Sequence, residues 1–266
     1  MNDETRLRRS RIFDEIAELY DQGRRECPSF LFDDLFALSG IVPVAARILE
    51  IGCGTGQATL PLARRGCEVL CVELGANLAK IARRKLAQFP RVTIVNASFE
   101  EWQPNGELFD IVLAVTSWHW IDPRVRYAKA AAALRPGGVL AFTTGGHACP
   151  PGFDSFFTEI QECYNAIGYG LPKWPFPPPA EVPDSRDEIE RSRYFDDVRI
   201  SRRVWTEEFT ADEHVALMAT ASDHQLLEPA KCERLFASMR RLINARPGRR
   251  IVKHNLTILH VARKKV

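Results

Sequence analysis

Apolar positions along the central half of the chain follow two patterns, which predict strands alternating with helices. Short runs rich in Val, Ile and Leu are typical of strands buried on both faces, and five of them predict strands at residues 47–51, 68–74, 92–97, 110–116 and 138–144. Between these runs the apolar residues recur at helical spacing. Each strand–helix unit spans about 20 to 30 residues, which is the length that a right-handed crossover needs. The pattern therefore predicts a mostly parallel α/β sheet.

The pattern changes after Gly146. Residues 147–185 are rich in proline and aromatic side chains. Because proline lacks the N–H that a central strand donates, we predict a non-sheet insertion here, with a helix at 153–167 and a rigid loop. Strand-like runs return at 198–209 and 250–264, and the second alternates strongly, as an antiparallel strand at or near a sheet edge does. Two helical patterns, at 211–227 and 229–245, lie between these two runs.

We expect one domain over residues 1–266. Its predicted parts are an N-terminal helical lid at 1–40, a cofactor-binding core at 47–146, a proline-rich and aromatic lid insertion at 147–195, and strands 6 and 7 at 196–266 with a helical insertion at 210–248.

Charge and cysteine content narrow the class of protein. Lys and Arg number 36 against 34 Asp and Glu, and a net charge of +2 speaks against bulk electrostatic capture of nucleic acid. No apolar run approaches the roughly 20 residues that would span a bilayer, and the N-terminus lacks the apolar core of a signal peptide. The seven cysteines are scattered, and Cys67 and Cys71 have no second pair or His cluster beside them. We therefore expect reduced thiols, no metal site and a cytoplasmic protein.

A glycine turn follows the first strand, with glycines at 52, 54 and 56. Such a turn lets the backbone approach a ligand, and the helix that opens at Gln57 points free amides toward it. A dinucleotide fingerprint would need its third glycine at position 57. Glu50, two residues before the turn, would repel a pyrophosphate and attract an ammonium group. S-adenosylmethionine carries an ammonium group and no phosphate, so the turn favours S-adenosylmethionine over NAD.

A second acid, Glu73, stands at the end of the next strand. An acid at this place can accept hydrogen bonds from both hydroxyls of a ribose, which S-adenosylmethionine and NAD share. Glu73 therefore indicates a nucleoside cofactor without choosing between these two. For Glu50, a structural strand-end charge is the alternative.

These segments resemble the class I S-adenosylmethionine-dependent methyltransferases, in the group of small bacterial enzymes that includes the ubiquinone/menaquinone-biosynthesis and trans-aconitate types. The matching segments, within residues 13–146, are ILEIGCGTG in the first motif, CVELGANLAKIAR in the ribose-binding strand and helix, FDIVLAVTSWHWIDP at the fourth strand and LRPGGVLAF at the fifth. The resemblance implies a doubly wound, Rossmann-like, seven-stranded, mostly parallel sheet of order 3-2-1-4-5-7-6, with strand 7 antiparallel and helical lid insertions. It also implies S-adenosylmethionine as cofactor, with Glu73 holding the ribose.

The glycine turn and the resemblance together give the cofactor-binding candidates Tyr20, Glu50, Gly52, Cys53, Gly54, Gly56, Gln57, Glu73, Leu74, Ser98, Phe99, Thr116 and Trp118. In the family, a tyrosine on the opening helix lies over the cofactor, which is the place of Tyr20, with Arg24 and Arg25 near the mouth. Many members carry an acid after the third strand that faces the adenine amino group, but here Ala97 stands in that place. We expect Ser98 and the backbone at Phe99 to contact the adenine instead, while the Phe99 ring packs on it or fills the core.

Methyl transfer from a sulfonium is an in-line displacement, to which an enzyme contributes proximity, alignment and desolvation. His119 is the candidate general base, because histidine titrates near neutrality; a contact with the cofactor or the lid is the alternative role. The motifs of enzymes that methylate base amino groups or cytosine C5 are absent, and only Asp122 stands where metal-dependent enzymes cluster acids.

We therefore expect a small-molecule methyl acceptor, and the aromatic insertion favours an apolar or aromatic one. The alternatives are an NAD-dependent oxidoreductase, an RNA methyltransferase and a catalytically idle cofactor-binding module. The sequence leaves open the acceptor, the methylated atom and the oligomeric state.

Overall fold

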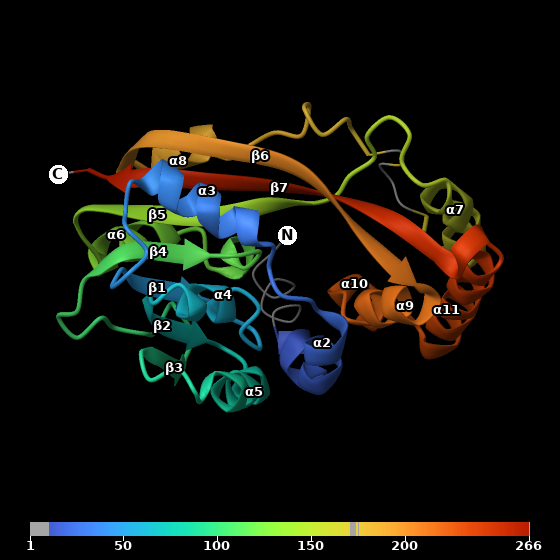
Figure 1. Cartoon of the computed structure of the whole chain (residues 1–266), viewed down its shortest axis with the longest axis horizontal. Helices are drawn as coiled ribbons and strands as arrows, with labels where there is room; N and C mark the ends of the chain where they lie inside the picture. The colour runs from blue at the N-terminus through green and yellow to red at the C-terminus, as the bar shows by residue number, and fades with distance from the viewer. Residues whose placement is uncertain (1–10, 171–173, 175, 266) are drawn as a thin grey trace. The chain divides into compact units, whose positions relative to one another are not determined.

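The computed structural model describes residues 11–170, 174 and 176–265, and it shows an α/β fold with a seven-stranded sheet (Figure 1). The strands are β1 Arg47–Ile51, β2 Glu68–Glu73, β3 Val92–Asn96, β4 Phe109–Ala114, β5 Leu134–His147, β6 Phe195–Thr210 and β7 Arg250–Lys264. The α-helices are α2 Ala17–Gly23, α3 Ser29–Ser39, α4 Thr59–Arg64, α5 Ala76–Leu86, α6 Arg126–Ala133, α7 Phe156–Ala166, α8 Arg186–Ser192, α9 Ala211–Ala219, α10 Ser222–Gln225 and α11 Pro229–Asn244, and the 3-10 helices are η1 Trp118–Trp120 and η2 Pro247–Arg249.

The strand order is β3-β2-β1-β4-β5-β7-β6, with β7 antiparallel, which confirms the predicted fold. The pairs β1–β2, β2–β3, β1–β4 and β4–β5 are parallel. The helical pattern at 211–227 forms two helices, because α9 ends at its C-cap residue Thr220 and α10 begins at Ser222. There the Thr220 hydroxyl donates to the backbone oxygen of Leu217 at 2.7 Å, so the side chain closes the last turn of α9.

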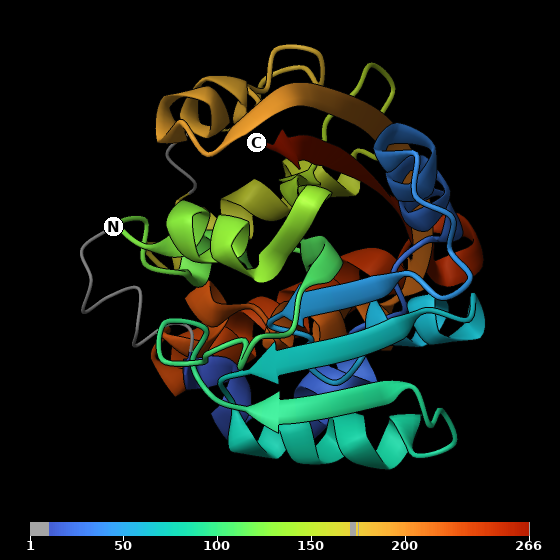
Figure 2. The same cartoon turned by 90° about the vertical axis from the view of Figure 1, so that its left-hand side faces the viewer.

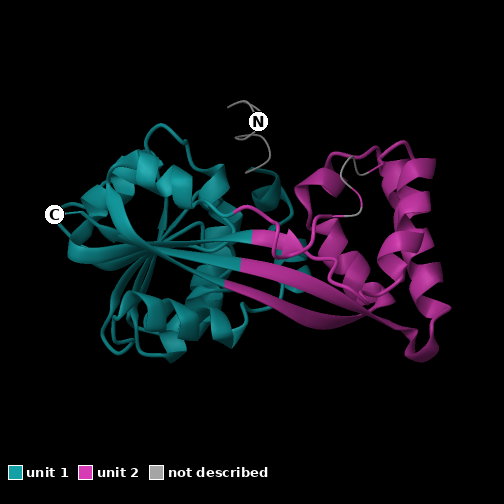
Figure 3. Ribbon diagram, turned by 90° about the horizontal axis from the view of Figure 1, so that it is seen from above, with its two compact units in different colours: residues 1–144, 184–201, 258–266 teal, residues 145–183, 202–257 magenta. Residues whose placement is uncertain are grey.

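The chain divides into two compact units, which Figure 3 shows in different colours. Unit 1 comprises residues 1–144, 184–201 and 258–266, and unit 2 comprises 145–183 and 202–257. Strands β5, β6 and β7 each have residues in both units. The predicted core therefore lies in unit 1 apart from its last two residues, and α8, from the predicted insertion, also belongs to unit 1.

In unit 1, successive residues of β1 point into different buried clusters, as period-two geometry requires. Ile48 packs with residues of α3, α4 and α5, among them Phe32, Leu35, Leu62 and Ala82. Leu49 packs with residues of α6 and α8, among them Tyr127, Ala130 and Ile189. Helices therefore cover both faces of the sheet, as the positions of α3 and α6 in Figure 2 illustrate, and this explains the uninterrupted apolar runs of the central strands.

Unit 2 has its own core, in which α7, α9 and α11 pack together through side chains such as Phe156, Val215, Leu235 and Met239. Across the described part of the chain, no helix combines the length and the apolarity that crossing a membrane would take. The polar features discussed next all belong to unit 1, at the carboxyl ends of β1 to β4. In open α/β sheets ligands bind at this edge.

Candidate functional site

The glycine turn after β1 has the backbone conformation that the sequence suggested. Gly52 and Gly54 adopt φ values of +71° and +59°, in the left-handed region that side chains disfavour. A Cβ atom on Gly52 would lie 2.8 Å from the Cβ of Ser117, and one on Gly54 would lie 3.3 Å from Cε1 of Tyr20. The turn is therefore closely packed between the segment after β4 and the N-terminal helix, and glycine is needed there for two reasons.

Glu73 joins the end of β2 to this turn. Its side chain is buried, and its carboxylate accepts hydrogen bonds from the backbone N–H of Gly54 at 2.8 Å and of Gly75 at 2.9 Å. Burial raises the pKa of Glu73 to about 7, although these two hydrogen bonds act in the opposite direction. The carboxylate lines the cavity described below and is held in a fixed position there.

Glu50 lies beneath the turn and does not line the cavity. It is 1% exposed, and its Oε2 accepts hydrogen bonds from the Thr59 hydroxyl at 2.8 Å and from the Cys71 thiol at 3.8 Å. Burial raises the pKa of Glu50 to about 7, and the nearby charge of Glu73 adds to the rise. Glu50 is placed to act on the cavity through its charge and through the turn above it.

The N-terminal segment is tied to the site by two aspartates. Asp21 Oδ1 accepts hydrogen bonds from the Thr55 hydroxyl at 2.6 Å and from Nζ of Lys85 at 2.5 Å. Asp14 Oδ1 accepts hydrogen bonds from the first free amides of α5, at Asn77 (2.7 Å) and Leu78 (3.0 Å). Sequence reasoning missed both. The sequence held no local signal for them, because their partners lie 34 or more positions away.

These elements surround a cavity of about 670 Å³ within unit 1, large enough for a cofactor-sized molecule. The predicted residues that line it are Tyr20, Gly52, Gly54, Glu73, Leu74, Ser98, Phe99, Thr116 and His119. The predicted residues that do not line it are Glu50, Cys53, Gly56, Gln57 and Trp118. Nine of the predicted residues therefore line one cavity and five lie outside its lining, and their roles stay predictions.

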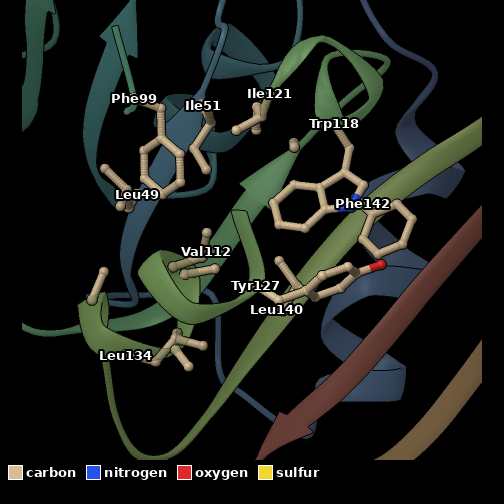
Figure 4. Close-up of a cluster of buried hydrophobic side chains, with 14 of the residues drawn as sticks. Leu49, Ile51, Phe99, Val112, Trp118, Ile121, Tyr127, Leu134, Leu140 and Phe142 are labelled. Carbon is tan, nitrogen blue, oxygen red and sulfur yellow. The ribbon is translucent and has the colours of Figure 1, made fainter. Parts of the chain in front are cut away.

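Gln57 and Trp118 do not line the cavity, and their contacts show where each side chain lies instead. Gln57 bonds to Thr55, donating to its hydroxyl at 2.6 Å and accepting from its N–H at 3.2 Å, so it shapes the turn from within. Trp118 is buried in the core of unit 1, where its ring stacks on Phe142 at 5.1 Å and meets Tyr127 edge-on at 5.2 Å (Figure 4).

Aromatic side chains close one side of the cavity. Phe13 contacts the rings of Tyr20 at 5.7 Å and Trp120 at 5.8 Å, which joins the N-terminal segment to η1. Sequence reasoning did not single out Phe13. Phe99 lines the cavity and also packs in the core of unit 1, stacked on Trp102 at 6.2 Å, so both of its expected roles are compatible with its position.

His119 lines the cavity next to Trp120, with ring centroids 4.4 Å apart. Burial, and to a lesser extent the charge of Arg126, lowers the pKa of His119, so the ring is neutral at neutral pH and can accept a proton. Arg126 donates to the backbone oxygen of Trp118 at 2.9 Å and forms an ion pair with Glu188 of α8. It thereby fixes the segment that carries His119.

Thr116 occupies a strained position at the start of this segment. Its φ is +54°, a conformation that costs a residue other than glycine about 1–2 kcal/mol, and its N–H donates to the hydroxyl of Thr143 at 2.9 Å. Strain of this kind concentrates at ligand sites, where the surrounding structure enforces it.

Comparison with known proteins identifies the fold around this cavity. Residues 48–138 match the family model described as a methyltransferase domain. An uncharacterized methyltransferase of Mycobacterium tuberculosis (strain ATCC 25618 / H37Rv) is 32% identical over 129 residues, which are 48% of this chain and 49% of that protein. The malonyl-[acyl-carrier protein] O-methyltransferase of Geobacter sulfurreducens is 31% identical over 142 residues, which are 52% of this chain and 49% of that protein. The chain thus spans about half the length of the curated relatives it matches.

Among solved structures, a putative type II methyltransferase from Anaeromyxobacter dehalogenans has the same fold, with a TM-score of 0.58, 23% identity, and coverage of 90% of this chain and 97% of that one. The strand order and the cavity at the carboxyl ends of β1 to β4 define a Rossmann-like α/β protein of the class I type. Residues 48–138 therefore resemble a methyltransferase domain, and the chain has the fold of the class I methyltransferases.

Proposed function

We propose that the protein transfers a methyl group from S-adenosylmethionine to a small-molecule acceptor by in-line displacement. The observation that carries the proposal is the carboxylate of Glu73, which lines the cavity and is held at the glycine turn by the N–H of Gly54. A pyrophosphate would be repelled by Glu73 in the cavity and, from behind the lining, by the negative charge of the buried Glu50, whereas both charges attract the positive ammonium and sulfonium groups of S-adenosylmethionine. The residues present therefore fit S-adenosylmethionine better than NAD.

The lining residues suggest how the cofactor lies. In this proposal Glu73 accepts hydrogen bonds from the ribose hydroxyls, and the methionine part lies at Gly52 and Gly54 beneath Tyr20. Arg24, whose guanidinium stacks on the Tyr20 ring at 5.4 Å and lines the cavity, is suited to the amino-acid carboxylate. The base then lies beyond Glu73, toward the segment after β3.

The bound cofactor supplies a sulfonium-linked methyl group and its leaving group. The chain's own residues hold it, exclude water and align the acceptor. His119 is neutral and lines the cavity, so its ring can take a proton from an acceptor that carries one on the attacking atom. An acceptor without such a proton would need His119 only as a wall residue.

The nature of the acceptor is the broader part of the proposal. A net charge of +2, from 36 basic and 34 acidic residues, supports a small molecule over a nucleic acid. One of the relatives is, by its name, an O-methyltransferase of malonyl-[acyl-carrier protein], which keeps carrier-bound acyl groups within the acceptor classes to be screened. No disulfide joins any two of the seven cysteines, all of which lie among the described residues, and this supports the proposal of a reducing, cytoplasmic environment.

Calorimetric titration with S-adenosylhomocysteine tests the cofactor. We expect saturable binding by the wild-type protein and no binding by Gly54→Arg, because the new side chain meets Tyr20. Gly106→Arg is the matched control, since Gly106 also has a positive φ (+85°) but has open space around its Cβ position and does not line the cavity. Folded wild-type protein that binds no S-adenosylhomocysteine would refute the proposal, and saturable binding of NADH in its place would favour an oxidoreductase.

A further inference from the structure

Thr143 is a buried polar residue that follows an apolar run in β5. The four residues before it, 139–142, are apolar and buried. A hydroxyl that leaves water in such surroundings is costly unless it forms a hydrogen bond. The Thr143 oxygen accepts one from the backbone N–H of Thr116 at 2.9 Å. Because Thr116 lines the cavity and Thr143 does not, the buried hydroxyl is connected to the site through Thr116.

The conformation of Thr116 needs support from its surroundings. Its φ of +54° lies in the left-handed region, which is disfavoured by about tenfold or more for a residue with a Cβ and is rarest for β-branched residues. β4 ends at Ala114, which pairs with Phe142 of β5, so Thr116 lies beyond the end of the strand. Its N–H donates to the Thr143 side chain, and this hydrogen bond offsets the strain at the point where the chain turns out of the sheet.

The next residue, Ser117, is anchored to the strand on the other side. β4 lies between β1 and β5 in the sheet (Figure 1). The Ser117 hydroxyl donates to the backbone oxygen of Ile51, the last residue of β1, at 2.5 Å. A Cβ atom on Gly52 would lie 2.8 Å from the Ser117 Cβ, so the segment after β4 packs directly on the glycine turn. A shift of the backbone at Thr116 would therefore also move the contact with the turn.

We propose that Thr143 is a positioning residue, whose hydroxyl holds Thr116 in the left-handed conformation and so keeps the wall segment 116–120 in place against the glycine turn. The inference rests on the proposed use of S-adenosylmethionine, which is the ligand that this wall and the turn would enclose. Without the hydroxyl, the N–H of Thr116 loses its acceptor while the strain remains, so the segment leaves its place part of the time. A ligand that needs the wall in place then binds with an affinity reduced by that fraction.

Substitutions at both ends of this contact separate the hydroxyl from the shape of the side chain. Thr143→Val keeps the branched shape and removes the hydroxyl, whereas Thr143→Ser keeps the hydroxyl and removes a methyl group. Thr116→Gly removes the strain, because glycine adopts a positive φ freely. Thr144→Val is the matched control, since Thr144 is the next residue of β5 and its buried hydroxyl has no hydrogen-bond partner within the described part of the chain.

The experiment combines amide hydrogen exchange of the cofactor-free full chain with calorimetric titration of S-adenosylhomocysteine, at a temperature at which every variant is folded. In Thr143→Val we expect exchange in residues 116–120 to be faster, and binding to be weaker, by about three- to tenfold each, which is the effect of one neutral hydrogen bond. Thr143→Ser and Thr144→Val keep the wild-type values. When Thr116→Gly is already present, Thr143→Val weakens binding by less than about twofold, because the unstrained segment stays in place without the bond.

Each result has a distinct meaning. A Thr143→Val protein that melts at a lower temperature but keeps the wild-type affinity overturns the inference, whether or not exchange in residues 116–120 is faster, and leaves the hydroxyl with a structural role in β5. Equal weakening with and without Thr116→Gly also overturns it, because the effect then does not depend on the strain. A wild-type protein that binds no S-adenosylhomocysteine refutes the proposed cofactor, and the exchange of residues 116–120 then decides by itself whether Thr143 holds the segment. Thr143→Ala, which also lacks the hydroxyl, takes the place of Thr143→Val if the valine variant does not fold.

Discussion

The carboxylate of Glu73 lies 2.8 Å from the backbone nitrogen of Gly54 and accepts its hydrogen bond, so the acid at the end of β2 is part of the glycine turn after β1. Two strands that are adjacent in the sheet thus build one ligand-binding edge. Glu73 therefore stabilises the turn through this hydrogen bond and also lines the cavity.

The two buried acids should therefore respond differently to removal of their charge. Glu73→Gln is expected to weaken S-adenosylhomocysteine binding by about tenfold or more, because a ribose loses a charged acceptor. Glu50→Gln should weaken it less, since Glu50 does not line the cavity and glutamine can still accept from the hydroxyl of Thr59. Calorimetry on both variants checks this order, and a larger loss in Glu50→Gln would contradict the geometry.

The raised pKa values of Glu50 and Glu73 predict that these two groups contribute less stability to the cofactor-free protein as the pH rises. Burial raises both pKa values from 4.5 to about 7, so the unfolded chain releases these protons at lower pH than the folded chain does. The stability that protonation contributes is full below about pH 4.5 and is lost as the pH rises toward 7, by about 3 kcal/mol for each group. From pH 5 to pH 8 the free energy of unfolding of Glu50→Gln should rise relative to that of the wild type, because the variant lacks the loss that Glu50 contributes, whereas the buried His147 and His214 titrate in both proteins alike. Thermal unfolding across this range measures the difference, and a difference that does not change with pH would show that Glu50 does not titrate there.

Part of this arrangement could be predicted from the sequence, because it depends on local pattern. The strands at 47–51 and 250–264 have the predicted bounds, since an apolar run that ends in glycine, or alternates over many residues, marks its own limits. The place of Glu73 beside the glycine turn follows from its position at the end of the second predicted strand, and its role toward a ribose, which the family resemblance implies, stays a prediction. The face of a strand can be inferred from alternation, but what covers that face cannot, which is why the depth of Glu50 under Thr59 was not foreseen.

Contacts between segments that are far apart in the chain could not be predicted from the sequence. Asp21 meets Thr55 across 34 positions and Lys85 across 64, and no local rule connects these residues. The break between α9 and α10 depends on the hydroxyl of Thr220 turning back to Leu217, which competes with the apolar periodicity that predicted one helix. The hydrogen bond from the N–H of Asp122 to Glu100 likewise joins the segments after β3 and β4 across 22 positions, and no local pattern predicts it.

Arg126 should control both the stability of unit 1 and the titration of His119. Its side chain is 11% exposed, and its guanidinium lies over the Trp118 ring at 5.3 Å and donates to the Trp118 backbone oxygen. Arg126→Met removes these contacts and should cost about 2 kcal/mol, whereas Arg124→Met, at a 72% exposed side chain, should cost under about 1 kcal/mol. Removing the nearby positive charge should also raise the pKa of His119, which histidine NMR can follow. An unmoved His119 titration would show that burial alone sets its pKa.

Asp21 should determine how often the N-terminal helix leaves the glycine turn. Burial opposes ionisation of Asp21, but the hydrogen bonds from Lys85 and Thr55 outweigh it and lower its pKa, so these contacts persist at neutral pH and are lost only on acidification. Asp21→Asn should open α2 about tenfold more often, which limited trypsin digestion after Arg24 and Arg25 can measure as faster cleavage, and S-adenosylhomocysteine should slow it. Glu18→Gln on the same helix is the control, because Glu18 pairs with Arg84 at 3.6 Å while 68% exposed and should change nothing. Equal cleavage rates in Asp21→Asn and the wild type would mean that the aromatic contacts of Phe13 and Tyr20 alone hold the helix in place.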